Sequence, residues 1–250
     1  MSGCVYLVGL GPGSAEHLTI RAADVLRSSD AVVGYGPYVD MVASWFPSET
    51  RRWVRGELGQ EAERAAEAVR LARSGQSVAL VSSGDASIYG MGGPLFEHLA
   101  GHDWDGRDPP VEVVPGVTAA LAANAVLGAP LADDLALISL SDVVAPWSVI
   151  ARRIEAAAAA EFVVALYNPA SRRRRTGIHQ AQALLLRHRD SSTPVALVRN
   201  ALRGDPSVRL TVLGHLLDDE PFIDMFTLVL IGNRHTLRIG NHLISRRVPR

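Results

Sequence analysis

Short apolar runs alternate with helical patterns along the chain, and this alternation restricts the fold more than any other feature. The alternating segments in the first half are strand-like runs at residues 5–8, 31–34, 78–81 and 111–114 and helical patterns at 18–27, 60–74 and 119–127. Strands that alternate with helices are typical of parallel sheets with helices packed on their faces. The sequence therefore predicts the α/β class. Residues 35–55, which contain two prolines and two tryptophans, are expected to be irregular.

The alternation restarts after Gly128-Ala129-Pro130, which we expect to be a hinge between two domains. The second series has strand-like runs at 135–140, 162–166, 195–198, 209–212 and 227–231 and helical patterns at 146–160 and 178–187. The predicted domains are residues 1–128 and 129–250. Two α/β domains joined by a hinge predict a ligand cleft between them.

Composition excludes several classes of partner and site. The formal net charge of −1 does not favour nucleic acid. Cys4 is the only cysteine, which excludes an internal disulfide and a thiolate metal cluster, and the eight histidines lack metal-ligand spacing. No apolar run is long enough to span a membrane, and the first residues lack the basic stretch of a signal peptide. We expect a cytoplasmic protein without metal, membrane or nucleic-acid partners.

The loop at residues 82–93 is the most informative single segment. It follows the apolar run 78–81 and precedes a short predicted helix at 94–99, so it lies at the carboxyl end of a strand. Ligands of open α/β sheets bind at such ends. The loop is rich in glycine and serine, which allows backbone amides to approach a ligand closely, and it contains one carboxylate, Asp85. The alternative is a glycine-rich turn with a helix N-cap at Asp85 or Ser87.

The first turn, residues 9–14, invites a dinucleotide-binding interpretation that fails on inspection. Gly9 and Gly11 fit the G-x-G-x-x-G pattern, but Ser14 occupies the third position. Pro12 removes an N–H that a pyrophosphate would use. The acidic residue expected after the second strand is absent, since Asp30 precedes that strand.

Five loops with unusual residues follow predicted strands in both halves: residues 9–13, 82–92, 115–118, 167–169 and 199–201. Loops at equivalent strand ends are what a shared ligand site requires. The sequence contains no nucleophile elbow, P-loop lysine or zinc signature. The reactive group is therefore expected to belong to a bound cosubstrate, which the protein orients.

Three of these loops contain sequence motifs that resemble those of a known protein family. The turn Gly9-x-Gly11-Pro12-Gly13 is followed by Leu18-Thr19, the central loop reads Ser83-Gly84-Asp85-x-x-x-Tyr89-Gly90, and residues 113–119 read Val-Val-Pro-Gly-Val-Thr-Ala. Together they resemble the tetrapyrrole methylases, the class III S-adenosylmethionine methyltransferases, over residues 5 to about 233. One departure stands out, because the family usually has proline after this aspartate and this chain has Ala86-Ser87.

The resemblance implies an activity. The stretches 89–91, 138–147, 165–169 and 198–200 are similar to family members that methylate precorrin-3B at carbon 17 and contract the macrocycle, giving precorrin-4 in cobalamin biosynthesis. S-adenosylmethionine is the implied cosubstrate, and a homodimer is the implied assembly. The alternatives are a relative that acts on cobalt-factor III or another precorrin, and a tetrapyrrole- or nucleotide-binding module without catalysis.

The resemblance also implies site residues. Those expected to line the cosubstrate pocket are Pro12, Ser83, Gly84, Asp85, Ile88, Thr118, Ala119, Tyr167, Asn168 and Ala201. Asp85 and Tyr167 are the candidate catalytic residues, although Asp85 would equally serve as a loop cap and Tyr167 as a strand-end aromatic. Arg199 and Arg172 are candidates for binding substrate carboxylates; the alternatives are a structural ion pair and a solvated charge run.

Overall fold

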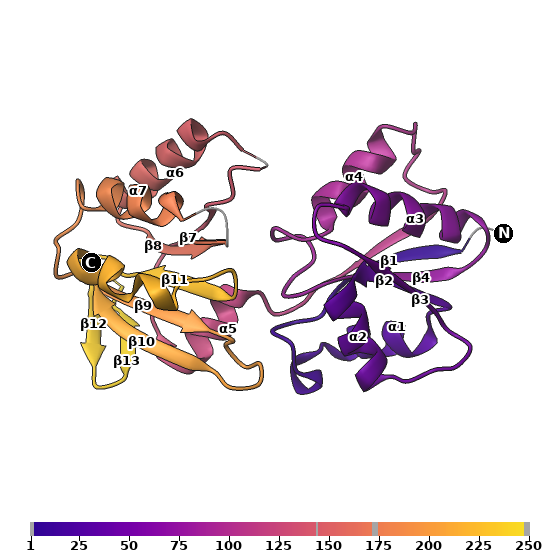
Figure 1. Ribbon diagram of the computed structural model, residues 1–250, viewed down its shortest axis with the longest axis horizontal. Coiled ribbons are helices and arrows are strands. Elements are labelled where there is room, and N and C mark those ends of the chain that lie inside the picture. The colour runs from indigo at the N-terminus through magenta and orange to yellow at the C-terminus, as the bar shows by residue number, and fades with distance from the viewer. Residues whose placement is uncertain (1–2, 144, 172–174, 248–250) are drawn as a thin grey trace. The chain divides into compact units, whose positions relative to one another are not determined.

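The computed structural model describes residues 3–143, 145–171 and 175–247, which form two compact units. Unit 1 is Met1–Thr118 and unit 2 is Ala119–Arg250 (Figure 1). Each unit contains a five-stranded sheet with helices packed on it, and unit 2 also contains a three-stranded sheet, β12-β13-β6. The predicted α/β class is therefore confirmed in both units.

Unit 1 contains one parallel sheet with the strand order β3-β2-β4-β1-β5. Its strands are β1 (Cys4–Gly9), β2 (Ala31–Tyr35), β3 (Arg52–Gly56), β4 (Ser77–Ser82) and β5 (Val111–Val114). Its helices are α1 (Ile20–Ser28), α2 (Gly36–Trp45), α3 (Glu61–Arg73) and α4 (Gly92–Ala100), with a short turn of 3-10 helix, η1 (Ala15–His17). Since all five strands are parallel, their carboxyl ends lie along one edge of the sheet.

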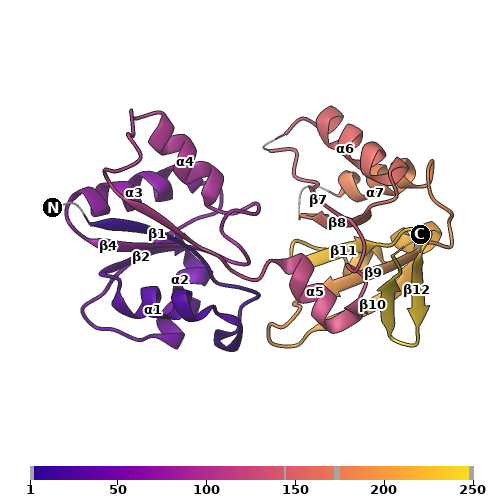
Figure 2. The same cartoon turned by 180° about the vertical axis from the view of Figure 1, so that it is seen from behind.

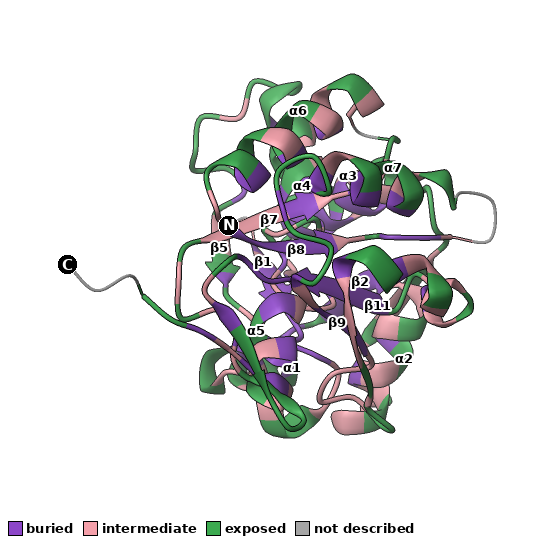
Figure 3. Cartoon of the chain, turned by 90° about the vertical axis from the view of Figure 1, so that its left-hand side faces the viewer, coloured by how far each residue is buried: buried purple, intermediate pink, exposed green. Residues whose placement is uncertain are grey.

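Both faces of this sheet are buried, which explains why its strands read as continuous apolar runs. Leu7 and Leu80 point into the cluster covered by α3 and α4, whereas their neighbours Val8 and Val81 point into the cluster covered by α1 and α2. The two helix pairs lie on opposite sides of the strands (Figure 1). The inner strands β1, β2 and β4 are mostly buried, whereas the outer helix faces are exposed (Figure 3).

Unit 2 contains a mixed sheet with the order β10-β9-β11-β8-β7. Its elements are α5 (Ala119–Leu127), β6 (Gly128–Ala129), β7 (Leu135–Ser139), α6 (Trp147–Ala159), β8 (Val163–Tyr167), α7 (Thr176–Leu185), β9 (Pro194–Arg199), β10 (Ser207–Val212), η2 (Leu213–Phe222), β11 (Thr227–Ile231), β12 (Thr236–Ile239) and β13 (His242–Ser245). Strands β8 and β9 both pair with β11 in antiparallel fashion, so they run parallel to each other. Strand β7 is parallel to β8. The carboxyl ends of β7, β8 and β9 therefore share one edge.

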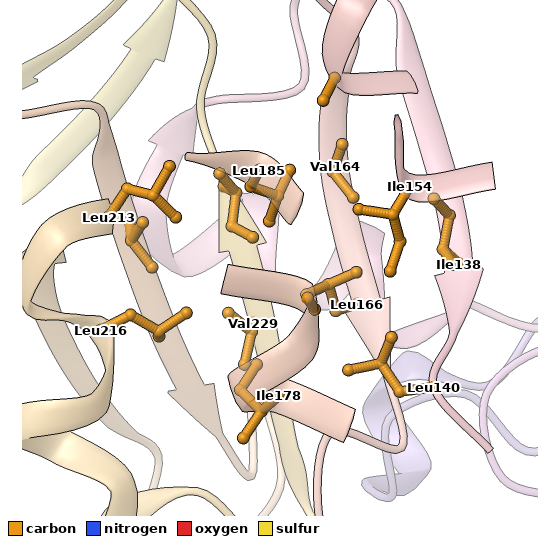
Figure 4. Packing of buried hydrophobic residues seen from close by; sticks show 14 of the residues in the cluster. Ile138, Leu140, Ile154, Val164, Leu166, Ile178, Leu185, Leu213, Leu216 and Val229 are labelled. Carbon is orange, nitrogen blue, oxygen red and sulfur yellow. The ribbon is translucent and has the colours of Figure 1, made fainter. Parts of the chain in front are cut away.

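The two faces of the second sheet are also covered. Helices α6 and α7 with η2 pack on one face, where Ile154, Ile178 and Leu216 contact strand residues such as Leu166 and Val229 (Figure 4). Helix α5 packs on the other face through Ala120, Ala123 and Leu127, as the reverse view shows (Figure 2).

The position of α5 changes the predicted domain boundary. The two compact units divide after Thr118, whereas the hinge was expected at Gly128–Pro130. Strand β6, which contains Gly128, instead pairs with β13 inside unit 2. Because the alanine face of α5 is buried against the second sheet, the helix belongs to unit 2.

Residues 35–55 are not irregular as predicted, since they form α2 and β3. Pro37 lies in the first turn of α2, where a missing N–H costs nothing and the fixed φ favours the helix. A proline at such a position starts a helix, although in the sequence it resembled a break. Among the described residues, no helix has the length and apolar composition needed to span a membrane.

Replacing Ile154 with alanine is expected to destabilise unit 2 by about 2 to 5 kcal/mol, because the side chain is fully buried between α6 and the sheet. The measurement is denaturant unfolding followed by circular dichroism. Arg153→Ala is the matched control, since Arg153 is exposed on the same helix. A loss below about 1 kcal/mol for Ile154→Ala would contradict the described packing.

Candidate functional site

Two turns of unit 1 are joined through their backbones at the carboxyl edge of the sheet. Gly11 N–H donates to the Gly84 carbonyl at 3.0 Å, and Gly84 N–H donates to the Gly11 carbonyl at 2.7 Å. Leu10 N–H also donates to the Ser82 carbonyl at 2.8 Å. The turn after β1 and the loop after β4 therefore act as one structural element.

A third turn, after β5, packs against these two, and only glycine fits the contact. A Cβ atom on Gly116 would lie 2.2 Å from the Gly84 carbonyl oxygen, and one on Gly9 would lie 2.7 Å from Gly116 N. Gly11 and Gly84 have φ values of +66° and +67°, which glycine adopts without strain. The three turns thus form a dense backbone cluster, which we call the glycine junction (Gly9, Gly11, Gly84 and Gly116).

Asp85 ties this junction together. Its Oδ1 accepts the Ser87 N–H at 2.8 Å, and its Oδ2 accepts the Gly116 N–H at 3.1 Å. The side chain is half-buried. The helix N-cap expected at Asp85 or Ser87 is wrong, since α4 begins at Gly92 and Met91 occupies its N-cap position. Asp85 instead caps the loop, and its contact with a ligand stays a prediction.

The other predicted residues of unit 1 lie on or beside the glycine junction. Pro12 is buried in the first turn, and Ser83 adjoins Gly84. Ile88 closes a turn, since its N–H donates to the Asp85 carbonyl at 3.2 Å. Thr118 is 6% exposed and ends the segment after β5.

Thr19 explains why Leu18-Thr19 follows the first turn in the sequence motif. Its hydroxyl oxygen accepts the Ala22 N–H at 3.1 Å and so caps α1. The same hydroxyl lies 3.4 Å from the Pro115 carbonyl, to which it donates. Thr19 thereby attaches the start of α1 to the turn after β5.

In unit 2, the predicted residues gather at the carboxyl ends of β7, β8 and β9. The Tyr167 hydroxyl accepts the Ala120 N–H at 3.0 Å, which brings the first turn of α5 to the end of β8. Asn168 Nδ2 donates to Ser139 Oγ at the end of β7 at 2.9 Å. Ala119, Tyr167 and Ala201 pack against the same apolar cluster. The loops after β8 and β9, which the sequence placed at equivalent strand ends, therefore do lie at one edge of the sheet.

Asn168 and Asn200 share an unusual backbone conformation at this edge. Their φ values are +52° and +53°. Asparagine tolerates this left-handed conformation better than most residues do. The chain therefore turns sharply directly after β8 and after β9.

Arg199 ends β9 and forms an ion pair. Its Nη2 lies 2.7 Å from Asp224 Oδ2, and the side chain is 40% exposed. The structural ion pair, one of its two alternatives, is thus present, and binding of a substrate carboxylate stays a prediction. Arg172 lies outside the described residues. Its neighbour in the same charge run, Arg175, lies 3.8 Å from Glu220 Oε1.

Two residues near the first loops were not selected from the sequence. His17 lies beside Gly11, and its Nδ1 is buried with no hydrogen-bond partner among the described residues. Tyr89 is 52% exposed and has a φ of +55°. No sequence pattern reveals such a conformation, because tyrosine rarely adopts it.

The donor set of these loops suits a small polar ligand. The Ser83 hydroxyl and the Asp85 carboxylate can bind the amino, carboxylate and hydroxyl groups of an amino-acid nucleoside. The described residues contain no group of three or more histidine, cysteine, aspartate or glutamate side chains that could hold a metal. Burial raises the pKa of the Cys4 thiol, which lies at the amino end of β1, away from the carboxyl edge.

Comparison with known proteins gives consistent matches. Residues 4–217 match the family model described as Tetrapyrrole (Corrin/Porphyrin) Methylases. A cobalt-factor III methyltransferase of Priestia megaterium is 41% identical over 248 residues, which are 99% of this chain and 45% of that protein. A probable cobalt-factor III C(17)-methyltransferase of Salmonella typhimurium is 41% identical, and the match covers 92% of each chain. The precorrin-3B C(17)-methyltransferase of a Sinorhizobium species is 38% identical over 94% of this chain and 91% of that protein. The chain thus spans under half of the Priestia protein and nearly all of the other two.

Solved structures match along most of the chain as well. The crystal structure of the methyltransferase CobJ has a TM-score of 0.91 at 32% identity, and the match covers 98% of this chain and all of that one. A uroporphyrin-III C-methyltransferase from Thermus thermophilus, complexed with S-adenosylhomocysteine, has a TM-score of 0.70 at 26% identity, covering 92% of this chain and 97% of that one.

Gly116→Ala is expected to destabilise the protein by about 2 kcal/mol or more, because the new methyl group would overlap the Gly84 carbonyl and push two turns apart. Thermal unfolding is the measurement, with an expected fall in Tm of about 4 °C or more. Gly93→Ala is the matched control, since a Cβ there meets no atom within 4 Å. An unchanged Tm for Gly116→Ala would show that the three turns do not pack as described.

Proposed function

The chain belongs to the tetrapyrrole (corrin/porphyrin) methylase family, and we propose that it transfers a methyl group to carbon 17 of precorrin-3B and contracts the macrocycle to give precorrin-4. The observation that carries the proposal is similarity to C(17)-methyltransferases over nearly the whole chain, in sequence and in fold. The glycine junction of unit 1 supports it, because the three turns that carry the family's sequence motifs converge there.

S-adenosylmethionine is the methyl donor of this family, and a related structure is complexed with S-adenosylhomocysteine. When bound, it supplies a methyl group that is already activated by the positive sulfonium. We assign its binding to two groups of residues: Pro12, Ser83, Gly84, Asp85, Ile88 and Thr118 in unit 1, and Ala119, Tyr167, Asn168 and Ala201 in unit 2. The polar groups among them fit the amino, carboxylate and ribose hydroxyl groups of this cosubstrate.

The protein's task in methyl transfer is mainly positional. The accepting carbon, the methyl group and the sulfur must lie in line, so the loops have to hold both molecules rigidly and exclude water. The glycine junction supplies rigidity, because the turns after β1 and β4 are joined by paired backbone hydrogen bonds and Asp85 holds the turn after β5. Asp85 therefore contributes to methyl transfer by holding the loops in position, without contact with a reacting atom.

Ring contraction adds a need for proton transfer at the substrate's hydroxyl and carbonyl groups. Tyr167 is the candidate for holding such a proton, since its hydroxyl accepts the Ala120 N–H and lies at the carboxyl edge of unit 2. Arg199 is the candidate for a substrate carboxylate, because its guanidinium is partly exposed at the same edge. We give Arg172 the same role from the sequence alone.

Cobalt-factor III is the second candidate substrate. Relatives named for it, from Priestia megaterium and Salmonella typhimurium, reach 41% identity, compared with 38% for the precorrin-3B enzyme. Cobalt-factor III, unlike precorrin-3B, carries a cobalt ion, which belongs to the substrate. The proposal further includes a cytoplasmic homodimer, as the family resemblance implies.

Incubation of the protein with precorrin-3B and methyl-labelled S-adenosylmethionine is expected to yield a labelled, ring-contracted product. Mass spectrometry identifies the added methyl group, and NMR of the product locates it at carbon 17. A parallel incubation with cobalt-factor III distinguishes the second candidate. If neither tetrapyrrole is methylated while S-adenosylhomocysteine binds at micromolar concentration, the assigned substrate is wrong.

Asp85→Asn is expected to weaken S-adenosylhomocysteine binding about tenfold or more, because an amide presents an N–H donor where the carboxylate accepts one of two backbone N–H groups. Calorimetric titration measures the affinity, and thermal unfolding measures the accompanying stability change. Asp105→Asn is the matched control, since Asp105 accepts the N–H groups of Arg107 and Asp108 in an exposed loop of the same unit. Equal affinities of the two variants for S-adenosylhomocysteine would show that Asp85 does not belong to the binding site.

A further inference from the structure

Tyr89 combines a strained backbone conformation with a large exposed area. It lies in the loop between β4 and α4, its φ is +55°, and 52% of it is exposed. A bulky residue in the left-handed conformation is strained, whereas glycine and asparagine adopt that conformation more easily. The loop thus keeps a large aromatic residue half-exposed at a position whose backbone conformation glycine or asparagine adopts with less strain.

The residues before Tyr89 are fixed by the site. Ser87 N–H donates to Asp85 Oδ1 at 2.8 Å, and Ile88 N–H donates to the Asp85 carbonyl at 3.2 Å. Since Asp85 is itself bound to the Gly116 N–H, the approach to Tyr89 is anchored to the glycine junction.

The residues after Tyr89 are fixed as well. Gly90 packs so closely that a Cβ there would lie 2.8 Å from the Ala86 carbonyl oxygen. Met91 is 4% exposed, its N–H donates to Ser82 Oγ at 2.9 Å, and its sulfur lies 3.7 Å from a nitrogen of the buried Arg64. Gly92 N–H donates to the Ala86 carbonyl at 2.8 Å. Anchors on both sides therefore impose the conformation of Tyr89, and strain that the surroundings impose in this way is typical of functional sites.

We propose that the Tyr89 ring is a stacking surface for the conjugated face of the tetrapyrrole. This inference rests on the proposed function, since it assigns a substrate contact to the same site. Tyrosine offers a large, rigid aromatic face with few rotatable bonds, and flat conjugated rings stack on such a face. Tyr89 is then a substrate-positioning residue that fixes the plane of the macrocycle relative to the loop.

The position of Tyr89 favours the macrocycle over the smaller cosubstrate. We assign the polar groups of the cosubstrate to the segment 83–85, through the Ser83 hydroxyl and the Asp85 carboxylate. Tyr89 is separated from that segment by the turn that Asp85 and Ile88 close. Tyr89 therefore lies outside the segment assigned to the cosubstrate, which leaves the macrocycle as the ligand to cover it.

The test compares three variants with the wild-type enzyme. Tyr89→Asn removes the ring and keeps a residue that tolerates positive φ, and Tyr89→Phe keeps the ring and removes the hydroxyl. Ile239→Asn is the matched control, because Ile239 is a large apolar residue that is 56% exposed on the β12–β13 hairpin. Binding of uroporphyrin III, a flat tetrapyrrole rich in carboxylates, is followed by its absorbance. Binding of S-adenosylhomocysteine is followed by calorimetry, and stability by thermal unfolding.

For Tyr89→Asn, the Kd for uroporphyrin III is expected to rise about tenfold. Its affinity for S-adenosylhomocysteine should stay within about twofold of the wild type. Its Tm should not fall, because asparagine adopts the left-handed backbone conformation of this position. Tyr89→Phe and Ile239→Asn should bind both ligands as the wild type does. In assays with the tetrapyrrole that the enzyme methylates, Tyr89→Asn should raise the KM for that tetrapyrrole about tenfold and change kcat less.

Three results would overturn the inference: wild-type tetrapyrrole affinity in Tyr89→Asn, a parallel loss of S-adenosylhomocysteine affinity, or no tetrapyrrole binding by the wild-type protein. Failure of the proposed function has a different signature. In that case the wild-type protein methylates neither precorrin-3B nor cobalt-factor III, yet its binding of uroporphyrin III still depends on Tyr89.

Discussion

The close backbone contact between three turns is the constraint on which the candidate site of unit 1 depends. Strands β4, β1 and β5 are neighbours in a parallel sheet, so the chain leaves all three at the same edge. Neighbouring strands lie about 4.8 Å apart, which leaves little room between the turns that follow them. Glycine at positions 9 and 116 removes the side chains that would separate these turns. Asp85 then adds the one charged group, and its two backbone contacts make its placement a consequence of the same packing.

Unit 2 reaches a comparable arrangement by different means. Its edge is joined through side chains, since the Tyr167 hydroxyl holds the start of α5 and Asn168 holds the end of β7. The antiparallel strand β11 begins at this edge, where Thr227 is opposite Arg199. The turn before β11 therefore delivers Asp224 to the guanidinium. A parallel strand would have ended there instead, and no acidic partner would have come from its amino end.

The sequence predicted the parts of this protein that follow from periodicity, and it missed those that depend on tertiary contacts. Buried strands such as β1 and β4 read as apolar runs because helices cover both faces of the sheet. Helix α5 was assigned to the wrong unit because its alanines fit either neighbour by pattern, and only their burial against the second sheet decides. Glycine at positive φ is predictable from its residue type. The positive φ of Tyr89 is instead imposed by hydrogen bonds of its neighbours to Ser82 and Asp85, which no sequence pattern reveals.

The ion pair of Arg199 is compatible with a role in substrate binding, although it gives the guanidinium a partner already. Asp224 is held independently of the arginine, since its Oδ1 accepts the Phe226 N–H at 2.9 Å and the Thr227 hydroxyl at 3.0 Å. Pairs this exposed contribute at most about 1 kcal/mol, because water competes for both charges. An arginine can also contact two carboxylates at once, as its five N–H donors point in different directions. Asp224 therefore fixes the direction of the guanidinium at little cost, and an orientation fixed before binding spares a substrate carboxylate the entropy of ordering a long side chain.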